Sequence, residues 1–198
     1  MKVTAIEPLD KRRSKVLFDE GFAFALYKGE IRKYRIVEGG ELSAADYQEI
    51  VSQVLSKRAR ERMAYLLKST DKTEQEIRKK LKDAWYPDEA IEAAISFGVR
   101  HHYIDDERYV ERYIEYKGRR KSKKQITFEL RQKGIAAELV SRLMEENPID
   151  EEEQVRTYLR KKRIDCASLT REERYKAASA LARKGISWET IRRVMGEG

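Results

Sequence analysis

The sequence predicts a mainly α-helical protein. Three tandem three-helix repeats are expected to form an elongated, curved array, after a small N-terminal segment that contains a β-hairpin. An internal repeat predicts the array, because the aligned leucines Leu81, Leu130 and Leu181 lie 49 and then 51 residues apart. Composition agrees: apolar residues make up only 40% of the chain and charged residues 39%, which suits short stacked units with few interior positions.

The N-terminal β segment is expected to span residues 1–42. In "KVLFDEGFAFALYKG" (15–29), apolar residues occupy every second position on both sides of Asp19-Glu20-Gly21. Alternation around a short turn-forming run is typical of a β-hairpin. The stretch "VTAI" (3–6) is a candidate third strand, and Gly39 and Gly40 mark the end of the segment.

Residues 43–104 are expected to hold a linking helix and the first repeat. Ser43 begins "SAAD", in which a serine precedes an acid by three residues, as in a helix-capping box. Apolar residues continue at helical spacing as far as Leu67, in one long helix or in two helices in series. The second repeat is assigned to residues 105–149 and the third to residues 150–198.

Each repeat shows the same signals for its three helices. The first helices are expected at roughly 56–68, 105–117 and 150–163, and the last two helices align without gaps over 76–95, 125–144 and 176–195. Capping boxes "TEQE" (73–76), "SKKQ" (122–125) and "TREE" (170–173) begin the middle helices. Gly134 and Gly185 stand where a helix end favours a left-handed residue, and in the first repeat Trp85 takes that place, with Pro87 opening the next helix.

The charge distribution indicates the kind of partner, and the lengths of the apolar runs indicate whether the chain can span a membrane. The net charge is +8, and the first 55 residues carry nine basic and nine acidic side chains, so the excess lies downstream. A basic surface favours nucleic acid, an acidic protein or an anionic membrane as partner. No apolar run is long enough to span a membrane, the N-terminus has no signal-type apolar core, and the single cysteine, Cys166, excludes an internal disulfide. We therefore expect a cytoplasmic protein without a membrane partner. A monomer is a separate expectation, which these observations do not carry.

No residue pattern predicts catalysis or a cofactor. Asp105, Asp106 and Glu107 could hold Mg²⁺ in a nuclease, but they open a predicted helix, where acids satisfy free N–H groups and suit the helix dipole. His101 and His102 are adjacent and point in different directions, so a metal site is not expected. Neither a GxxxxGK[ST] nor a GxGxxG run is present.

The strongest functional signal is a run of basic residues in the second repeat, "KGRRKSKKQITFELRQKGI" (117–135). Its eight basic side chains, offset by the single acid Glu129, form what is here named the basic cluster: Lys117, Arg119, Arg120, Lys121, Lys123, Lys124, Arg131 and Lys133. Cations at the start of a helix oppose its dipole, so local stability does not explain them. Phosphate oxygens or protein carboxylates are their natural counterparts.

Two further basic runs complete the candidate binding residues. One lies on the middle helix of the first repeat, and the other ends the first helix of the third repeat, where the dipole favours cations. Their candidate members are Arg78, Lys79, Lys82, Arg160, Lys161 and Lys162. With one run per repeat, an array would present them in succession to a long polyanion. Tyr109 and Tyr113 are expected in the core, and Tyr116 is a candidate for stacking on a base.

The second repeat also resembles a known family. "YIDDERYVERYIEYKGRRKSKKQITFELRQKGI" (103–135) is similar to the signature stretch of the RecX regulatory proteins, in which an Asp-Glu-Arg-aromatic opening is followed by an Ile-x-x-x-Leu-x-x-x-Gly-Ile run. Here these are residues 106–109 and then Ile126, Leu130, Gly134 and Ile135. The resemblance is clearest over residues 60–147 and weaker over 148–196, with Trp85 where glycine is common.

The resemblance implies a function that composition alone does not. RecX proteins are non-enzymatic tandem three-helix repeats that bind the RecA recombinase filament in its groove and approach its single-stranded DNA. They block filament growth or promote disassembly, which implies a role in homologous recombination, DNA repair and the SOS response. The alternative is a general single-stranded nucleic-acid-binding protein without a specific filament partner.

Overall fold

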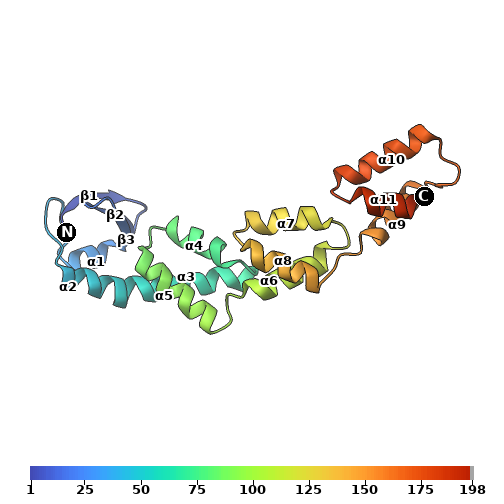
Figure 1. Ribbon diagram of the computed structural model, residues 1–198. Helices are drawn as coiled ribbons and strands as arrows, with labels where there is room; N and C mark the ends of the chain where they lie inside the picture. Colours follow the sequence, from blue (N-terminus) through green and yellow to red (C-terminus); the bar gives the residue numbers. More distant parts are fainter. Residues whose placement is uncertain (197–198) are drawn as a thin grey trace. The chain divides into compact units, whose positions relative to one another are not determined.

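The computed structural model describes residues 1–196 and consists of two compact units, Met1–Asp105 and the chain from Asp106 onward (Figure 1). The first unit contains the N-terminal sheet and the first repeat, and the second contains the other two repeats.

The first unit begins with a three-stranded antiparallel sheet in the order β1-β2-β3: β1 is Val3–Pro8, β2 is Arg13–Phe18 and β3 is Ala23–Tyr27. Val16 in β2 pairs with Ile6 in β1 and with Phe24 in β3. The hairpin turn contains Gly21 at a φ of 81°, a left-handed value that glycine adopts without steric cost. The predicted hairpin and the third strand are both confirmed.

A short helix in this segment was not predicted. Helix α1 (Lys28–Lys33) contains a single apolar residue, Ile31, so it has no apolar periodicity to indicate a helix. Its Glu30 side chain accepts a hydrogen bond from the Tyr27 amide at 2.8 Å and also forms an ion pair with Arg58. Contacts beyond the segment therefore stabilise a helix that local sequence does not signal.

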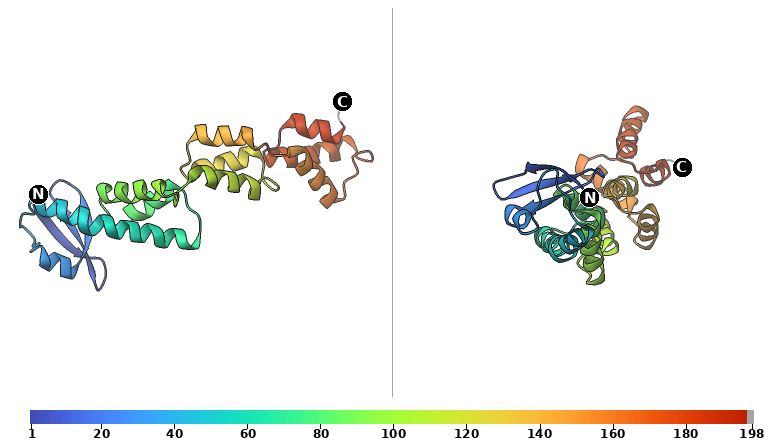
Figure 2. Two further views of the ribbon diagram at one scale, coloured as in Figure 1. Left: turned by 90° about the horizontal axis from the view of Figure 1, so that it is seen from below. Right: turned by 90° about the vertical axis from the view of Figure 1, so that its left-hand side faces the viewer.

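The linking helix and the first helix of repeat 1 form one continuous helical path. It comprises α2 (Ala44–Glu49), a π-helical segment η1 (Ile50–Leu55) and α3 (Ser56–Ser69), as Figure 2 shows. Ser43 caps its start by accepting from the Asp46 amide at 3.0 Å, as predicted. In the π-helical turn the Ser56 hydroxyl donates to the Val51 carbonyl at 2.8 Å. Of the two predicted arrangements, the structure therefore has the single long helix, with a π-helical distortion inside it.

The N-terminal sheet and the first repeat share one hydrophobic core. Buried residues from Val3 to Ile104 form a single cluster, which includes the helices α4 (Glu74–Lys82) and α5 (Asp88–Arg100). Phe24, Leu55 and Leu81, from three different parts of the unit, are fully buried in it. The sheet is therefore an integral part of this unit.

Trp85 occupies the joint that holds glycine in the other two repeats. Its φ of 63° is left-handed, a conformation that costs a non-glycine residue about 1–2 kcal/mol. Its carbonyl accepts a hydrogen bond from the Ala25 amide in β3 at 3.0 Å, and the Lys15 ammonium lies 3.8 Å from its ring centroid. Both contacts join the sheet to repeat 1, and the contact between Lys15 and the ring is one that glycine could not make.

The second unit contains six helices within its described residues: α6 (Asp106–Lys117), α7 (Lys123–Gln132), α8 (Ala137–Glu146), α9 (Glu151–Lys162), α10 (Arg171–Arg183) and α11 (Trp188–Met195). The first three surround a core with Val110, Leu130 and Val140, and the last three surround a core with Val155 and Leu181. Tyr109 and Tyr113 pack against the first core, as predicted.

The predicted caps and joints are confirmed. Thr73, Ser122 and Thr170 each accept a hydrogen bond from the amide three residues on, and each receives the reciprocal bond of a capping box. Gly134 and Gly185 adopt left-handed φ values of 80° and 88°. These local signals explain why the repeat pattern could be identified before the tertiary packing.

We expect Gly134→Ala to lower the free energy of unfolding by about 1 kcal/mol, because alanine is strained at this left-handed φ. Gly29→Ala is the matched control, since Gly29 lies in α1 and an added Cβ there meets no atom within 4 Å. It should raise the free energy by roughly 0.5 kcal/mol. Urea unfolding followed by circular dichroism measures the free energy of unfolding of both variants. If the two substitutions changed this free energy in the same direction, the left-handed strain assigned to position 134 would be contradicted.

Candidate functional site

The basic cluster surrounds the start of α7. Lys117 ends α6, and the connecting residues 118–122, here named the basic loop, carry Arg119, Arg120 and Lys121. Lys123 and Lys124 then form the first turn of α7. Ser122, the N-cap, fixes this arrangement because its side chain is buried and binds the Gln125 amide at 3.4 Å.

Most cations of the cluster are exposed, and five of them form no ion pair with another described residue. Within residues 1–196 no ion pair involves the following side chains, all of which are exposed: Arg119, Arg120, Lys123, Lys124 and Arg131. The N-terminus of α7 adds the positive end of its dipole at the same place. These cations and the helix N-terminus together are suited to binding anionic groups.

Lys121 differs from the five exposed cations named above because it forms an ion pair with Glu129. The same carboxylate accepts a hydrogen bond from the Tyr113 hydroxyl at 2.7 Å. The Lys121 ammonium, followed by Tyr113, holds the pKa of Glu129 below its ordinary value. Burial, followed by Glu129, raises the pKa of Tyr113 to about 12. Lys121 thus also connects the basic loop to α7.

The lowered pKa of Glu129 predicts a pH dependence of stability. Its contribution is present above the ordinary carboxyl pKa of 4.5 and is lost as the pH falls through the lower folded-state pKa. We expect Glu129→Gln to remove this part of the acid-induced decrease in thermal midpoint. Melting curves of both proteins between about pH 2.5 and pH 6 measure the difference. If the thermal midpoints of the two proteins fell equally as the pH is lowered, the role assigned to the Lys121–Glu129 pair would be contradicted.

The other two basic runs are placed differently within their repeats. On α4, the Arg78 guanidinium binds Glu92 on α5, and it binds Glu74 at 2.7 Å; the bond to Glu92, followed by the bond to Glu74, raises the pKa of Arg78. On α9, Arg160 binds Glu153 at 2.9 Å. The remaining candidates are exposed: Lys79, Lys82, Lys161 and Lys162. The runs therefore lie on a middle helix, around a loop and on a first helix, and not at equivalent positions.

Part of the basic cluster borders a hollow within the second unit. The hollow has a volume of about 640 Å³, and its lining includes Arg119 and Arg120 together with Lys161 on α9. Four acids also line it: Glu111, Glu115, Asp150 and Glu153. The structure thus brings one residue of the third basic run to the same hollow as the basic loop, a proximity that sequence spacing did not predict.

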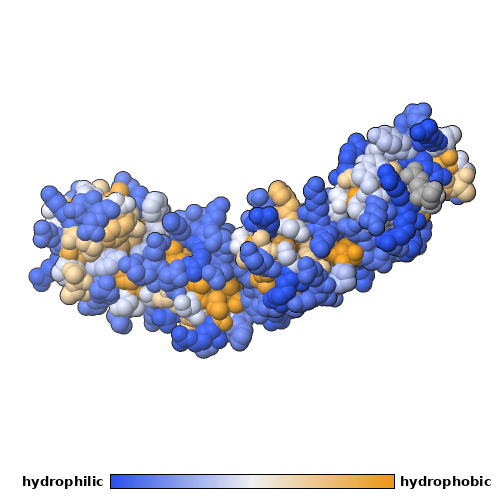
Figure 3. All heavy atoms as spheres, in the orientation of Figure 1, coloured by the Kyte–Doolittle hydropathy of each residue, from blue (hydrophilic) through white to orange (hydrophobic). Residues whose placement is uncertain are grey.

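Figure 3 shows a largely hydrophilic surface with small apolar patches.

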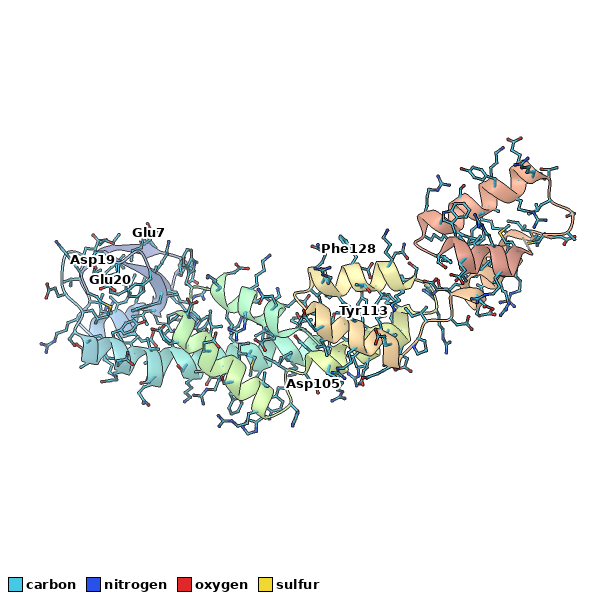
Figure 4. All side chains as sticks on the ribbon, viewed as in Figure 1. Glu7, Asp19, Glu20, Asp105, Tyr113 and Phe128 are labelled. Carbon is cyan, nitrogen blue, oxygen red and sulfur yellow. The ribbon has the colours of Figure 1, made fainter. Side chains whose placement is uncertain are left out.

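Two exposed aromatic side chains accompany the cluster. Tyr116, the predicted stacking candidate, is 73% exposed, and the Lys117 ammonium lies 4.7 Å from its ring centroid. Phe128, which the sequence reasoning did not select, is 63% exposed on α7, four residues after Lys124 and three before Arg131. Figure 4 shows Phe128 projecting from α7, whereas Tyr113 of α6 lies between the helices, where its hydroxyl binds Glu129 of α7. Exposed aromatic rings beside cations suit unstacked bases.

The described residues contain no group of three or more histidine, cysteine or acidic side chains that could hold a metal ion. Asp150 caps α9 by accepting from the Glu153 amide at 2.8 Å, as expected for acids that open a first helix. None of the helices in residues 1–196 has the length and apolar character that a membrane crossing requires.

Comparison with known proteins identifies the repeats. Models of the first, second and third three-helix domains of RecX match residues 59–97, 105–144 and 150–195. The regulatory protein RecX of Clostridium acetobutylicum is 27% identical over 98% of this chain and 95% of its own length. That of Clostridium botulinum is 24% identical, over 99% of this chain and 95% of its own length.

Solved structures show the same fold. A crystal structure of regulatory protein RecX is 23% identical, covers 100% of this chain and 99% of its own, and superposes with a TM-score of 0.62. RecX from Lactobacillus salivarius is 19% identical, covers 72% of this chain and 96% of its own, and gives a TM-score of 0.61. With three domain models matched in order and relatives covering nearly the whole chain, the protein belongs to the RecX family of regulatory proteins.

Proposed function

We propose that this protein is a non-enzymatic regulator of RecA. It binds RecA–single-stranded-DNA filaments in their groove and inhibits or remodels them, which reduces recombinase activity in homologous recombination, DNA repair and the SOS response in the cytoplasm. Membership of the RecX family supports regulation of RecA. The observation that carries the binding step is that four cations around the start of α7 are exposed and form no ion pair within residues 1–196: Arg119, Arg120, Lys123 and Lys124.

Binding to the filament is expected to depend on charge. A strand of DNA is a polyanion, and each phosphate that a cation neutralises releases a counterion, so binding weakens as salt rises. Arg119, Arg120, Lys123 and Lys124 are available for such contacts because their side chains are exposed and form no ion pair within residues 1–196. Acidic groups on RecA would be bound by the same cations. Contacts from three repeats on one chain reinforce one another through their effective concentration.

The decisive comparison is between coated and bare DNA. Fluorescence anisotropy with a labelled oligo(dT) strand, at one fixed salt concentration, gives the affinity for the bare strand and for the same strand coated with RecA. We expect tighter binding to the coated strand. Equal affinities would contradict the proposal and support the alternative, a general single-stranded nucleic-acid-binding protein.

A further inference from the structure

The basic loop connects α6 to α7 in repeat 2, yet it is held by side chains and backbone of repeat 3. The carboxamide of Gln154, on α9, donates from Nε2 to the Gly118 carbonyl at 2.5 Å and to the Lys121 carbonyl at 2.9 Å. The Ser122 hydroxyl donates to the Lys184 carbonyl, between α10 and α11, at 2.7 Å. The loop is therefore anchored at both ends by the neighbouring repeat.

Further contacts make this junction close and specific. Glu151 of α9 accepts from the Lys123 amide at 3.4 Å and from the Ser187 amide at 3.5 Å. A Cβ added at Gly185 would lie 2.6 Å from the Ser122 hydroxyl oxygen. Position 185 therefore favours glycine for two reasons: its φ is left-handed, and the Ser122 hydroxyl approaches too closely for a Cβ.

Gln154 differs from the other members of the junction because its two bonds flank the arginines. Gly118 immediately precedes Arg119, and Lys121 immediately follows Arg120. Fixing a carbonyl on either side restricts the peptide planes, and hence the directions in which the two arginine side chains leave the backbone. A loop without these bonds would have to order itself on binding, at an entropic cost.

We propose that Gln154 is a positioning residue for anion binding by Arg119 and Arg120. It acts from repeat 3 by preordering the basic loop, and its target is the phosphodiester backbone of single-stranded DNA. This inference rests on the proposed function, because the cations are the same.

The test compares Gln154→Met, which keeps the length of the side chain but cannot donate a hydrogen bond, with Gln132→Met. Gln132 is an exposed residue at the end of α7. We expect Gln154→Met to weaken oligo(dT) binding about fivefold or more, the effect of losing one or two hydrogen bonds, and to reduce the salt dependence. Gln132→Met should bind like the unsubstituted protein, and both should keep its circular dichroism spectrum at the assay temperature.

A double-mutant cycle separates positioning from general destabilisation. If Gln154 acts through the arginines, Gln154→Met should change affinity less than about twofold in an Arg119→Ala, Arg120→Ala background. An equal loss in both backgrounds would show that Gln154 acts independently, and would overturn the inference. So would full affinity of the single variant.

Hydrogen exchange distinguishes failure of this inference from failure of the proposed function. In Gln154→Met, the amides of residues 118–122 should exchange faster while those of Ile126 and Leu130 in the core remain protected. Unchanged loop exchange contradicts positioning by Gln154, whether or not the protein binds DNA. Faster exchange in a protein that binds neither DNA nor filament would contradict the proposed function and leave the loop contact supported.

Discussion

Reversing four charges around the start of α7 is expected to abolish inhibition of RecA. The variant carries Glu in place of Arg119, Arg120, Lys123 and Lys124. All four side chains are exposed and form no ion pair within residues 1–196, so the change places acids where we propose phosphates or RecA carboxylates bind. We expect affinity for the RecA-coated strand to fall roughly a hundredfold or more, and the slope of log affinity against log salt to decrease by about 3.

The control variant carries the same change in net charge elsewhere. Lys57, Lys68, Arg171 and Arg183 are exposed, lie outside the three basic runs and form no ion pair within the described part of the chain. Their reversal should leave most of the binding intact. An equal loss would show that net charge alone, and not the basic cluster, determines binding.

Glu129→Gln should act in the opposite direction from the four-charge reversal and strengthen binding, because it removes the one acid within residues 117–135.

Replacing Leu130 by alanine is expected to have the largest effect on stability. Leu130 is fully buried among the eight residues that form the core of repeat 2. The lost apolar contacts and the resulting cavity should cost about 2–5 kcal/mol. Because the basic cluster lies on α6, the basic loop and α7, all within this repeat, inhibition of RecA should be lost at the temperature where the repeat unfolds.

Phe128 provides the comparison for Leu130 on the same helix. It is 63% exposed, so Phe128→Ala should change the free energy of unfolding by less than about 0.5 kcal/mol. Thermal melts followed by circular dichroism measure both variants. Similar midpoints for Leu130→Ala and the unsubstituted protein would contradict the placement of Leu130 in the core.

The repeats could be predicted because their signals are local. The capping box of Ser122 spans four residues, and the left-handed conformation at Gly134 needs only the end of one helix. Helix α1 was missed for the opposite reason, since Glu30 contacts Arg58, which lies 28 residues away in α3. Sequence periodicity carries no information about such a partner.

The candidate site was only partly predictable. Arg78 and Arg119 belong to similar basic runs, but Arg78 binds Glu92 on the next helix, whereas the Arg119 side chain forms no ion pair among the described residues. The two bonds from Gln154 join residues 36 and 33 positions apart and require two repeats to be packed together. Which cations remain available, and which residues hold them, depends on tertiary contacts that no local pattern reveals.

The most direct test of the account is the rate of ATP hydrolysis by RecA on single-stranded DNA, measured while this protein is added up to a molar excess. We predict a dose-dependent decrease in the rate, which becomes weaker as salt is raised and is absent with the four-charge reversal variant. A rate that stays unchanged at excess protein would contradict the claim that this member of the RecX family regulates RecA filaments.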